Sequence, residues 1–336
     1  MDSKVILLAH GSGGKATHQL IDSLFVAHFK NVILSDLTDA ALLSVSGDKI
    51  LFTTDSYVVD PIFFPGGDIG KLAVHGTVND LAVCGGKPLY LSLSLILEEG
   101  FPLEQLTVIT QSIAEAAADA DVMIVTGDTK VVEHGSVDKI FINTAGIAQL
   151  HAGARLAIKN IRPGDAIVLS GSIGDHGIAI MLEREGLQFE SQVTSDSAPL
   201  HGMVADMMQE AAAIRFMRDP TRGGIATILN EICSQSHLGI TIYEAKIPIK
   251  PHVASACEIL GLDPLYIANE GKLMAIVDPD RAEKILAIMR RNRYGADAAI
   301  IGMVTEDVPG TVILKTTIGG SRIVDMLAGE QLPRIC

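Results

Sequence analysis

The chain has 336 residues, of which 48% are hydrophobic and 20% are charged, a balance typical of a globular protein. Its 26 basic and 40 acidic residues give a formal net charge of -14, which disfavours contact with a phosphate backbone, so we expect no nucleic-acid partner. No signal segment and no apolar run of membrane-spanning length is found, so we expect a cytoplasmic protein without membrane contact. The length favours two domains.

The first half of the chain alternates short apolar runs with helical patterns, which favours an α/β class. Pro102 and an alanine-rich face support a helix over 103–119 in particular. The turn Pro163-Gly164-Asp165 then leads into a new strand, and we place the domain boundary close to residue 150. The expected strands are 49–55, 89–97, 122–128 and 139–148, and the other expected helices are 14–27 and 69–84.

The second half is again predicted to be α/β. The predicted organisation is an N-terminal domain over 1–150, a C-terminal α/β domain over 151–325 and a flexible tail over 326–336. The expected helices are 175–185, 199–213, 222–236, 251–260 and 280–291, with strands at 166–171, 272–277 and 298–304.

The four cysteines are widely spaced, so a disulfide framework is not expected. Two of them have histidines at spacings that zinc could use, but both fall on apolar helical patterns, which favours core cysteines instead. The residues concerned are Cys233 with His237 and Cys257 with His252, and the other cysteines are Cys84 and Cys336.

Cys336 is the last residue of the tail sequence EQLPRIC. A chain end is usually mobile unless it docks, and an exposed thiol is open to oxidation. One interpretation is an ordinary last residue. The other is a tethered thiol that carries a chemical group into a distant active site.

Three aspartates flank or interrupt apolar elements. Asp55 and Asp128 lie at the ends of predicted strands, where α/β sheets present ligands, and Asp80 lies in an otherwise apolar helix. A buried charge is costly unless it is paired or metal-bound, so three such carboxylates suit Mg²⁺ with the phosphates of ATP. Capping and turn roles are the alternative, and they explain Asp80 least well. Asp39 could be a fourth carboxylate. Lys130 could neutralise a phosphate or be a solvated lysine beside Glu133.

Three glycine-rich stretches precede predicted helices: HGSGGK at 10–15, GDHG at 174–177 and RDPTRGG at 218–224. The first completes neither a P-loop nor a dinucleotide fingerprint, yet its backbone N–H groups could cover phosphates. Ordinary turns and close backbone packing are the alternatives. Arg222 could contact a phosphate, and Glu270 could be a general base or a surface turn residue.

These stretches, together with HGTVNDLAVCGG, VTGDTKVV, NEGKL and the final PRIC, resemble the hydrogenase maturation carbamoyl dehydratases of the HypE family. The resemblance spans almost the whole chain. The central motifs are shared with aminoimidazole ribonucleotide synthetase, selenophosphate synthetase and thiamine-phosphate kinase, whereas PRIC is particular to the dehydratases. The resemblance implies a two-domain aminoimidazole-ribonucleotide-synthetase-like fold with a mobile C-terminal tail, and a homodimer formed through the N-terminal domains.

The resemblance also implies the chemistry. The carbamoyltransferase HypF would load a carbamoyl group onto Cys336, and the tail would then enter the ATP cleft. Phosphorylation of the carbamoyl oxygen by Mg–ATP and loss of phosphate would leave a thiocyanate. Its cyanide would pass to iron on the HypC–HypD scaffold for nickel–iron hydrogenase.

The residues expected to act follow from this resemblance and from the motifs. Glu270 is the expected proton acceptor, with Lys130 second. The expected metal ligands are Asp39, Asp55, Asp80 and Asp128. The expected cofactor-binding residues are Gly11, Gly13, Gly14, Lys15, Lys71, Asn79, Thr129 and Arg222.

The sequence departs from the family pattern at one point, because Thr38 rather than a second acid precedes Asp39, which leaves the role of Asp36 open. Positions 10–15 hold no cysteine, which argues against the selenophosphate branch. Two other functions compete. A small-molecule ATP-dependent synthetase or kinase would leave PRIC unexplained, and a non-catalytic thiol carrier would leave Asp80 unexplained.

Overall fold

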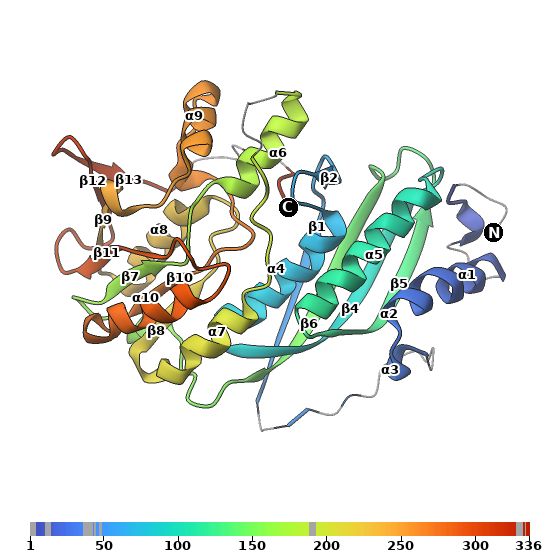
Figure 1. Cartoon of the computed structure of the whole chain (residues 1–336), viewed down its shortest axis with the longest axis horizontal. Helices are drawn as coiled ribbons and strands as arrows, with labels where there is room; N and C mark the ends of the chain where they lie inside the picture. The colour runs from blue at the N-terminus through green and yellow to red at the C-terminus, as the bar shows by residue number, and fades with distance from the viewer. Residues whose placement is uncertain are drawn as a thin grey trace.

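The computed structural model describes residues 5–10, 15–35, 43, 45–46, 49–187, 193–326, 332 and 334–336. Within them the chain forms two α/β units, one around each of two sheets (Figure 1). This agrees with the predicted α/β class. No helix in the described ranges combines the length and apolarity that a membrane crossing requires.

The N-terminal sheet has four strands in the order β1-β6-β4-β5, antiparallel except for the β4–β5 pair. Helices α4 and α5 cover one of its faces (Figure 1). The strands are β1 (Ile50–Tyr57), β4 (Gly86–Glu98), β5 (Met123–Val132) and β6 (Ile140–Leu150), and the helices are α4 (Ile69–Val83) and α5 (Leu103–Asp119).

Short elements flank this sheet at the start of the chain and after β1. They are η1 (Leu8–His10), α1 (Lys15–Leu20), the π-helical turn η2 (Ile21–Val26), α2 (Ala27–Phe29), α3 (Val32–Ser35), and the paired strands β2 (Phe63–Phe64) and β3 (Gly67–Asp68).

The second sheet has seven strands in the order β13-β12-β9-β11-β7-β10-β8. One apolar core joins α8 to it and a second joins α7 and α10 to it. The strands are β7 (Ala166–Leu169), β8 (Ile214–Arg218), β9 (Gly239–Tyr243), β10 (Met274–Val277), β11 (Ala299–Thr305), β12 (Val312–Lys315) and β13 (Ser321–Val324). The helices are α6 (Asp175–Glu185), α7 (His201–Met207), α8 (Gly224–Ser236), α9 (Pro251–Leu260) and α10 (Ala282–Arg291), with turns η3 (Ile158–Asn160), η4 (Met208–Ala213), η5 (Glu244–Lys246), η6 (Pro264–Tyr266) and η7 (Pro279–Arg281).

Helix α4 lies between the two domains and is buried along nearly its whole length. Only Lys71 and Asp80 among its residues are partly exposed. Asp68 caps its start by accepting from the backbone of Gly70 at 2.7 Å. Gly76 allows a close approach, because a Cβ there would lie 2.3 Å from the Tyr57 hydroxyl. The small residues of this helix therefore let it pack tightly while it carries Asp80 into the interface.

The cysteine prediction agrees with the described structure. Cys233 lies buried in α8 and Cys257 lies buried in α9. Both thiols are core residues, and burial raises the pKa of each.

Candidate active site

Four acidic side chains lie where the two domains meet, close enough to interact electrostatically with one another. Asp55 comes from β1 and Asp80 from α4, while Asp219 follows β8 and Glu270 precedes β10. We call these four residues the carboxylate cluster. Among the described residues, none of the four has a basic partner at ion-pair distance.

The cluster carries negative charge that its surroundings do not balance. Burial, and next the charge of Asp55, raises the pKa of Asp80. Burial, and next the charge of Asp80, raises the pKa of Asp219. Glu270 is only 3% exposed, and burial followed by the charge of Asp219 raises its pKa well above the ordinary value. Its buried Oε1 has no hydrogen-bond partner in the described part of the chain.

The donor set of the cluster fits a hard divalent cation, because every donor is a carboxylate oxygen. The carboxylates do not converge into a three-ligand site as they stand, within the residues that the structure describes. Mg²⁺ usually keeps several waters and needs only one or two protein carboxylates beside phosphate oxygens. The unbalanced charge and the donor type therefore suit Mg²⁺ bound together with a phosphate.

Two further charged groups expected at this site lie on β5, away from the carboxylate cluster. Asp128 and Lys130 are both largely exposed on β5 and form an ion pair of 3.1 Å with each other. Asp55 and Asp128 also lie inside their strands, not at the strand ends as predicted, because β1 and β5 continue to Tyr57 and Val132. Within one chain the structure thus brings Asp55 and Asp80 together and leaves Asp128 and Lys130 apart from them.

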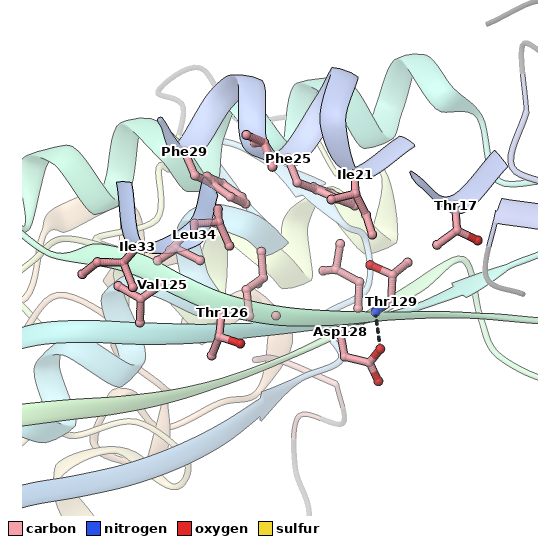
Figure 2. Close-up of a pocket in the computed structure, with 15 residues that line it drawn as sticks. Thr17, Ile21, Phe25, Phe29, Ile33, Leu34, Val125, Thr126, Asp128 and Thr129 are labelled. Atoms are coloured by element: carbon pink, nitrogen blue, oxygen red, sulfur yellow. Dashed lines mark hydrogen bonds between the residues drawn. The ribbon is translucent and has the colours of Figure 1, made fainter. Parts of the chain in front are cut away.

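An apolar groove of about 250 Å³ lies between the N-terminal helices and strands β4 and β5 (Figure 2). Its walls come from one face of η2, α2 and α3 and from the facing strand residues. Asp128 borders the groove with its side chain on the far side of the strand from the helices, and Thr129 borders it beside Asp128. The remaining lining includes Phe25, Phe29, Ile33, Leu34 and Val125.

Asn79 has a different role from the predicted cofactor contact. It is 1% exposed, and its amide nitrogen donates to the carbonyls of Ala198 at 3.0 Å and Glu270 at 3.1 Å. Its Oδ1 accepts from the Leu200 backbone at 2.8 Å. All these partners belong to the C-terminal domain, so Asn79 ties α4 to that domain and fixes the backbone of Glu270.

The other predicted cofactor-binding residues are distributed along the interface. Lys71 donates to the Gly66 carbonyl at 2.9 Å and lies nine residues before Asp80, which is about 13 Å along a helix. Arg222 is exposed and lies close enough to Asp80 for its charge to counter the rise in the pKa of that carboxyl. Lys15 begins α1. Gly11, Gly13, Gly14 and Asp39 lie outside the described residues, as do Asp36 and Thr38.

The end of the tail is docked between the domains, close to α6 and β2 (Figure 1). The Val58 backbone donates to a main-chain oxygen of Cys336 at 3.0 Å, and the Asp60 backbone donates to the carbonyl oxygen of Arg334 at 3.2 Å. Ile335 is 3% exposed, and Cys336 packs against the N-terminal core. The predicted flexibility therefore does not describe residues 334–336 in this conformation, and release of the tail remains a prediction.

Cys336 lies beside the residues that directly follow β1. Val58 follows Asp55 by three residues, which is about 10 Å of extended chain. The tail runs antiparallel to residues 58–60, so its end is directed back toward β1. The structure thus places a thiol, a buried carboxyl group and a charged cluster at one domain interface.

Asp219 and Asp196 are two further residues of this interface that sequence reasoning did not assign. Asp219 lies in the stretch 218–224 before a predicted helix, for which the sequence leaves phosphate binding, an ordinary turn and close backbone packing open. Asp196 accepts from the Glu270 backbone at 3.0 Å and pairs with Lys272 at 3.0 Å. Burial acts to raise the pKa of Asp196, but Lys272 and that backbone bond outweigh it and lower the pKa. The contacts of Asp196 leave no periodic pattern in the sequence, whereas the NEGK motif makes Glu270 a candidate site residue.

The two-domain architecture and this interface define the class of protein. The N-terminal domain family of AIR synthase related proteins matches residues 37–150, and the corresponding C-terminal domain family matches residues 162–315. The carbamoyl dehydratase HypE of Rhizobium leguminosarum bv. viciae is 56% identical over 330 residues, covering 98% of this chain and 94% of its own. The chain therefore belongs to the HypE family of carbamoyl dehydratases.

Solved structures agree with this assignment. A crystal structure of the hydrogenase maturation protein HypE in complex with ATP is 50% identical and superposes with a TM-score of 0.95, covering 98% of this chain and 99% of its own. HypE in a HypE–HypF complex is 53% identical with a TM-score of 0.81, covering 92% and 99%. The predicted fold class, family and enzyme class are confirmed.

Proposed function

We propose that this chain carries a carbamoyl group on the thiol of Cys336 and uses ATP to dehydrate it to a thiocyanate. The observation that carries the proposal is the docking of Cys336 at the interface that also holds Glu270 and the aspartates. An amide oxygen leaves poorly as such, and phosphorylation converts it into a good leaving group. The tethered thiol would bring the substrate to the phosphate donor without a separate binding step.

The proposed reaction has two steps. In the first, the carbamoyl oxygen of the S-carbamoyl group attacks the γ-phosphorus of ATP, and ADP leaves. In the second, the C–O bond breaks, phosphate leaves with that oxygen, and the nitrogen loses its two protons to form S–C≡N. In sum, the S-carbamoyl group and ATP are converted into the thiocyanate, ADP, phosphate and one proton. The cyanide would then be passed on as a ligand for the iron of nickel–iron hydrogenase.

Residues of the interface would share these tasks. Glu270, buried with one oxygen unpartnered in the described structure, would accept a proton from the nitrogen. Asp55, Asp80 and Asp219 would hold Mg²⁺, which supplies charge neutralisation at the phosphates when bound. Arg222 would add positive charge beside them.

ATP binding is proposed from the HypE–ATP structure and from the groove beside β5. The groove is apolar, which suits a purine, and Thr129 at its border has a hydroxyl that suits the ribose (Figure 2). Gly11, Gly13, Gly14 and Lys15 directly precede or begin α1, whose Thr17 borders the same groove. Their backbone would cover the phosphates.

A homodimer would bring the separated groups together. The face of the N-terminal sheet away from α4 exposes Phe52 at 68% and Ile96 at 41%, and β1 and β5 are its two edges. A second copy packed on this face, with β5 of one copy beside β1 of the other, would place Lys130 and Asp128 of each copy next to the carboxylate cluster of the other. The further proposed partners are HypF, which the HypE–HypF structure supports, and a HypC–HypD iron scaffold.

Coupling of ATP turnover to the loaded thiol tests the proposal. We expect protein carbamoylated by HypF and carbamoyl phosphate, and then freed of both, to release one ADP per carbamoyl group, and unloaded protein to release almost none. Cys336→Ser, which retains the size of the side chain, should show only the unloaded level. Equal ADP release with and without loading would favour a small-molecule kinase, and loading without ADP release would favour a carrier.

A further inference from the structure

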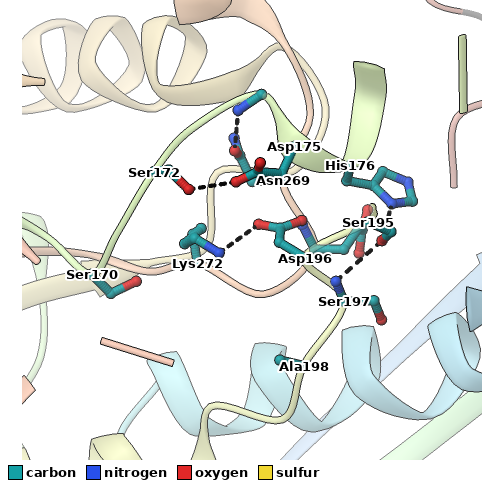
Figure 3. Close-up of polar contacts among 12 residues, drawn as sticks. Ser170, Ser172, Asp175, His176, Ser195, Asp196, Ser197, Ala198, Asn269 and Lys272 are labelled. Carbon is teal, nitrogen blue, oxygen red and sulfur yellow. Dashed lines mark hydrogen bonds and ion pairs between the residues drawn. The ribbon is translucent and has the colours of Figure 1, made fainter. Parts of the chain in front are cut away.

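A line of hydrogen bonds runs from the docked tail to the loop that contacts Glu270. Figure 3 shows its part between His176, Ser195 and Ser197. His176, in the first turn of α6, is fully buried. Its Nε2 lies 2.8 Å from the carbonyl oxygen of Ile335, and its Nδ1 lies 2.8 Å from Ser195 Oγ. The Ser197 backbone in turn donates to Ser195 Oγ at 3.1 Å.

The direction of these bonds fixes the tautomer of His176. A carbonyl oxygen only accepts, so Nε2 must carry the proton that it donates to Ile335. In the neutral ring Nδ1 then accepts, so the hydroxyl of Ser195 donates to it, and Ser195 Oγ remains available to accept from the Ser197 backbone. Burial lowers the pKa of His176, which favours this neutral form. With this tautomer, each of the three hydrogen bonds between Ile335, His176, Ser195 and Ser197 has one donor and one acceptor.

The ring of His176 is held in place on its other sides as well. Phe64 of β2 meets it edge to face, with ring centroids 5.6 Å apart. Gly177 allows the close approach of the neighbouring loop, since a Cβ there would lie 2.5 Å from Ile267 Cγ2. Because the His176 ring is packed and its tautomer is fixed, its Nε2–H group is held at a defined position. It can therefore fix the position of the Ile335 carbonyl.

The tail is held by hydrogen bonds to its main-chain oxygens. The carbonyl of Arg334 accepts from the Asp60 backbone and from Arg184, and that of Ile335 accepts from His176. A main-chain oxygen of Cys336 accepts from the Val58 backbone. None of these contacts uses the Cys336 side chain.

We propose that His176 is a positioning residue that holds the docked tail through the Ile335 carbonyl and so sets the depth of the Cys336 sulfur at the domain interface. His176 comes from the C-terminal domain, as does Arg184 at the Arg334 carbonyl, and it contacts the residue directly before the thiol. Val58 and Asp60 belong to the N-terminal domain. The catalytic consequence of this placement rests on the proposed function. The docking itself does not, because it concerns contacts within the resting chain.

Amide hydrogen exchange tests the docking directly. The N–H groups of Val58 and Asp60 donate to the tail, so their exchange reports how often the tail leaves. In His176→Asn the amide can reach Ser195 but not Ile335, and we expect these two amides to exchange about tenfold faster, as for the loss of one buried hydrogen bond. In His176→Gln the longer amide places a donor near the former Nε2, and exchange should return toward the wild-type rate. The amides of β6 serve as the internal reference and should be unchanged.

Single-turnover dehydration of preloaded protein gives the second readout. We expect His176→Asn to lower the dehydration rate by about tenfold with an unchanged KM for ATP and undiminished loading by HypF, and His176→Gln to recover most of the rate. Wild-type exchange at Val58 and Asp60 in both variants would overturn the proposal. Equal acceleration in both, accompanied by faster exchange in β6, would also overturn it and assign His176 a general structural role. If wild-type protein dehydrates nothing, the proposed function fails while the exchange result stands on its own.

Discussion

Replacing Glu270 by Gln should lower the rate of dehydration of the loaded thiol by about 10²–10⁴-fold, the usual contribution of a positioned general base. Gln keeps the size of the side chain and cannot take a proton. The backbone contacts of Glu270 to Asn79 and Asp196 do not involve the carboxyl group, so the fold should persist. Loading of Cys336 by HypF should be unaffected, because it precedes proton removal from the nitrogen.

The pH dependence of the same reaction follows from the environment of Glu270. Burial and the neighbouring carboxylates raise the pKa of Glu270, and a base acts only in its deprotonated form. Activity should therefore be lost as the pH falls through that raised pKa. A cation on the aspartates would compensate their charge and lower the pKa of Glu270, so increasing Mg²⁺ should move the acid limb to lower pH.

Single-turnover assays of preloaded protein measure both effects. Glu258→Gln, an exposed glutamate of α9, is a matched control and should behave as wild type. A Glu270→Gln variant that dehydrates at the wild-type rate would remove Glu270 from the mechanism and leave Lys130 as the candidate proton acceptor.

Replacing Asp219 by Asn should have two opposite effects. ATP turnover by loaded protein should fall by about 10²–10³-fold, because the site loses a charge that the cation and the phosphates require. The cation-free protein should become more stable at neutral pH, because one of several mutually repelling carboxylates is removed.

The sign of the stability change depends on pH. Burial and Asp80 raise the folded-state pKa of Asp219 to about 7, while the unfolded value is about 4. Between these values the folded chain binds more protons than the unfolded chain, so the free energy of unfolding falls as the pH rises through this range. In Asp219→Asn the free energy of unfolding should lack this decrease with rising pH, because asparagine does not titrate. We expect its melting temperature to exceed that of wild type at pH 8 without Mg²⁺, by about 2–4 °C per kcal/mol regained, and to match it near pH 4.

Calorimetry with and without Mg²⁺ checks this expectation. Wild type should gain stability from Mg²⁺ and Asp219→Asn should gain less, whereas Asp206→Asn, an exposed aspartate of α7, should follow wild type. A melting temperature of Asp219→Asn below that of wild type at pH 8 without Mg²⁺ would contradict the repulsion that we assign to the carboxylate cluster.

Most of the helices could be predicted from the sequence because their apolar spacing and caps are local signals. The predictions for 103–119, 175–185 and 251–260 coincide with α5, α6 and α9. Strands β8, β9, β12 and β13 were not predicted. Each has four or five residues, too few for a clear alternation, and β8 directly follows the alanine run that favours a helix.

The candidate site was predictable only in part. Asp80 stood out because an apolar helix gives no local reason for a charge. Asp55 and Asp128 have equivalent positions in the predicted strands. Within one chain only Asp55 belongs to the carboxylate cluster, because β1 and β5 are opposite edges of the sheet. The docking of the tail depends on backbone carbonyls meeting Val58, Asp60 and His176, and such contacts leave no pattern in the sequence.

The intact mass of the purified protein with HypF, carbamoyl phosphate and Mg–ATP tests the central claim most directly. We predict that wild type gains one carbamoyl group before ATP acts on that adduct and then loses one water when ATP is hydrolysed, while Cys336→Ala does neither. A carbamoyl adduct that forms equally well in Cys336→Ala, or a wild-type adduct that never loses water while ATP is consumed, would contradict a dehydratase acting on its own thiol.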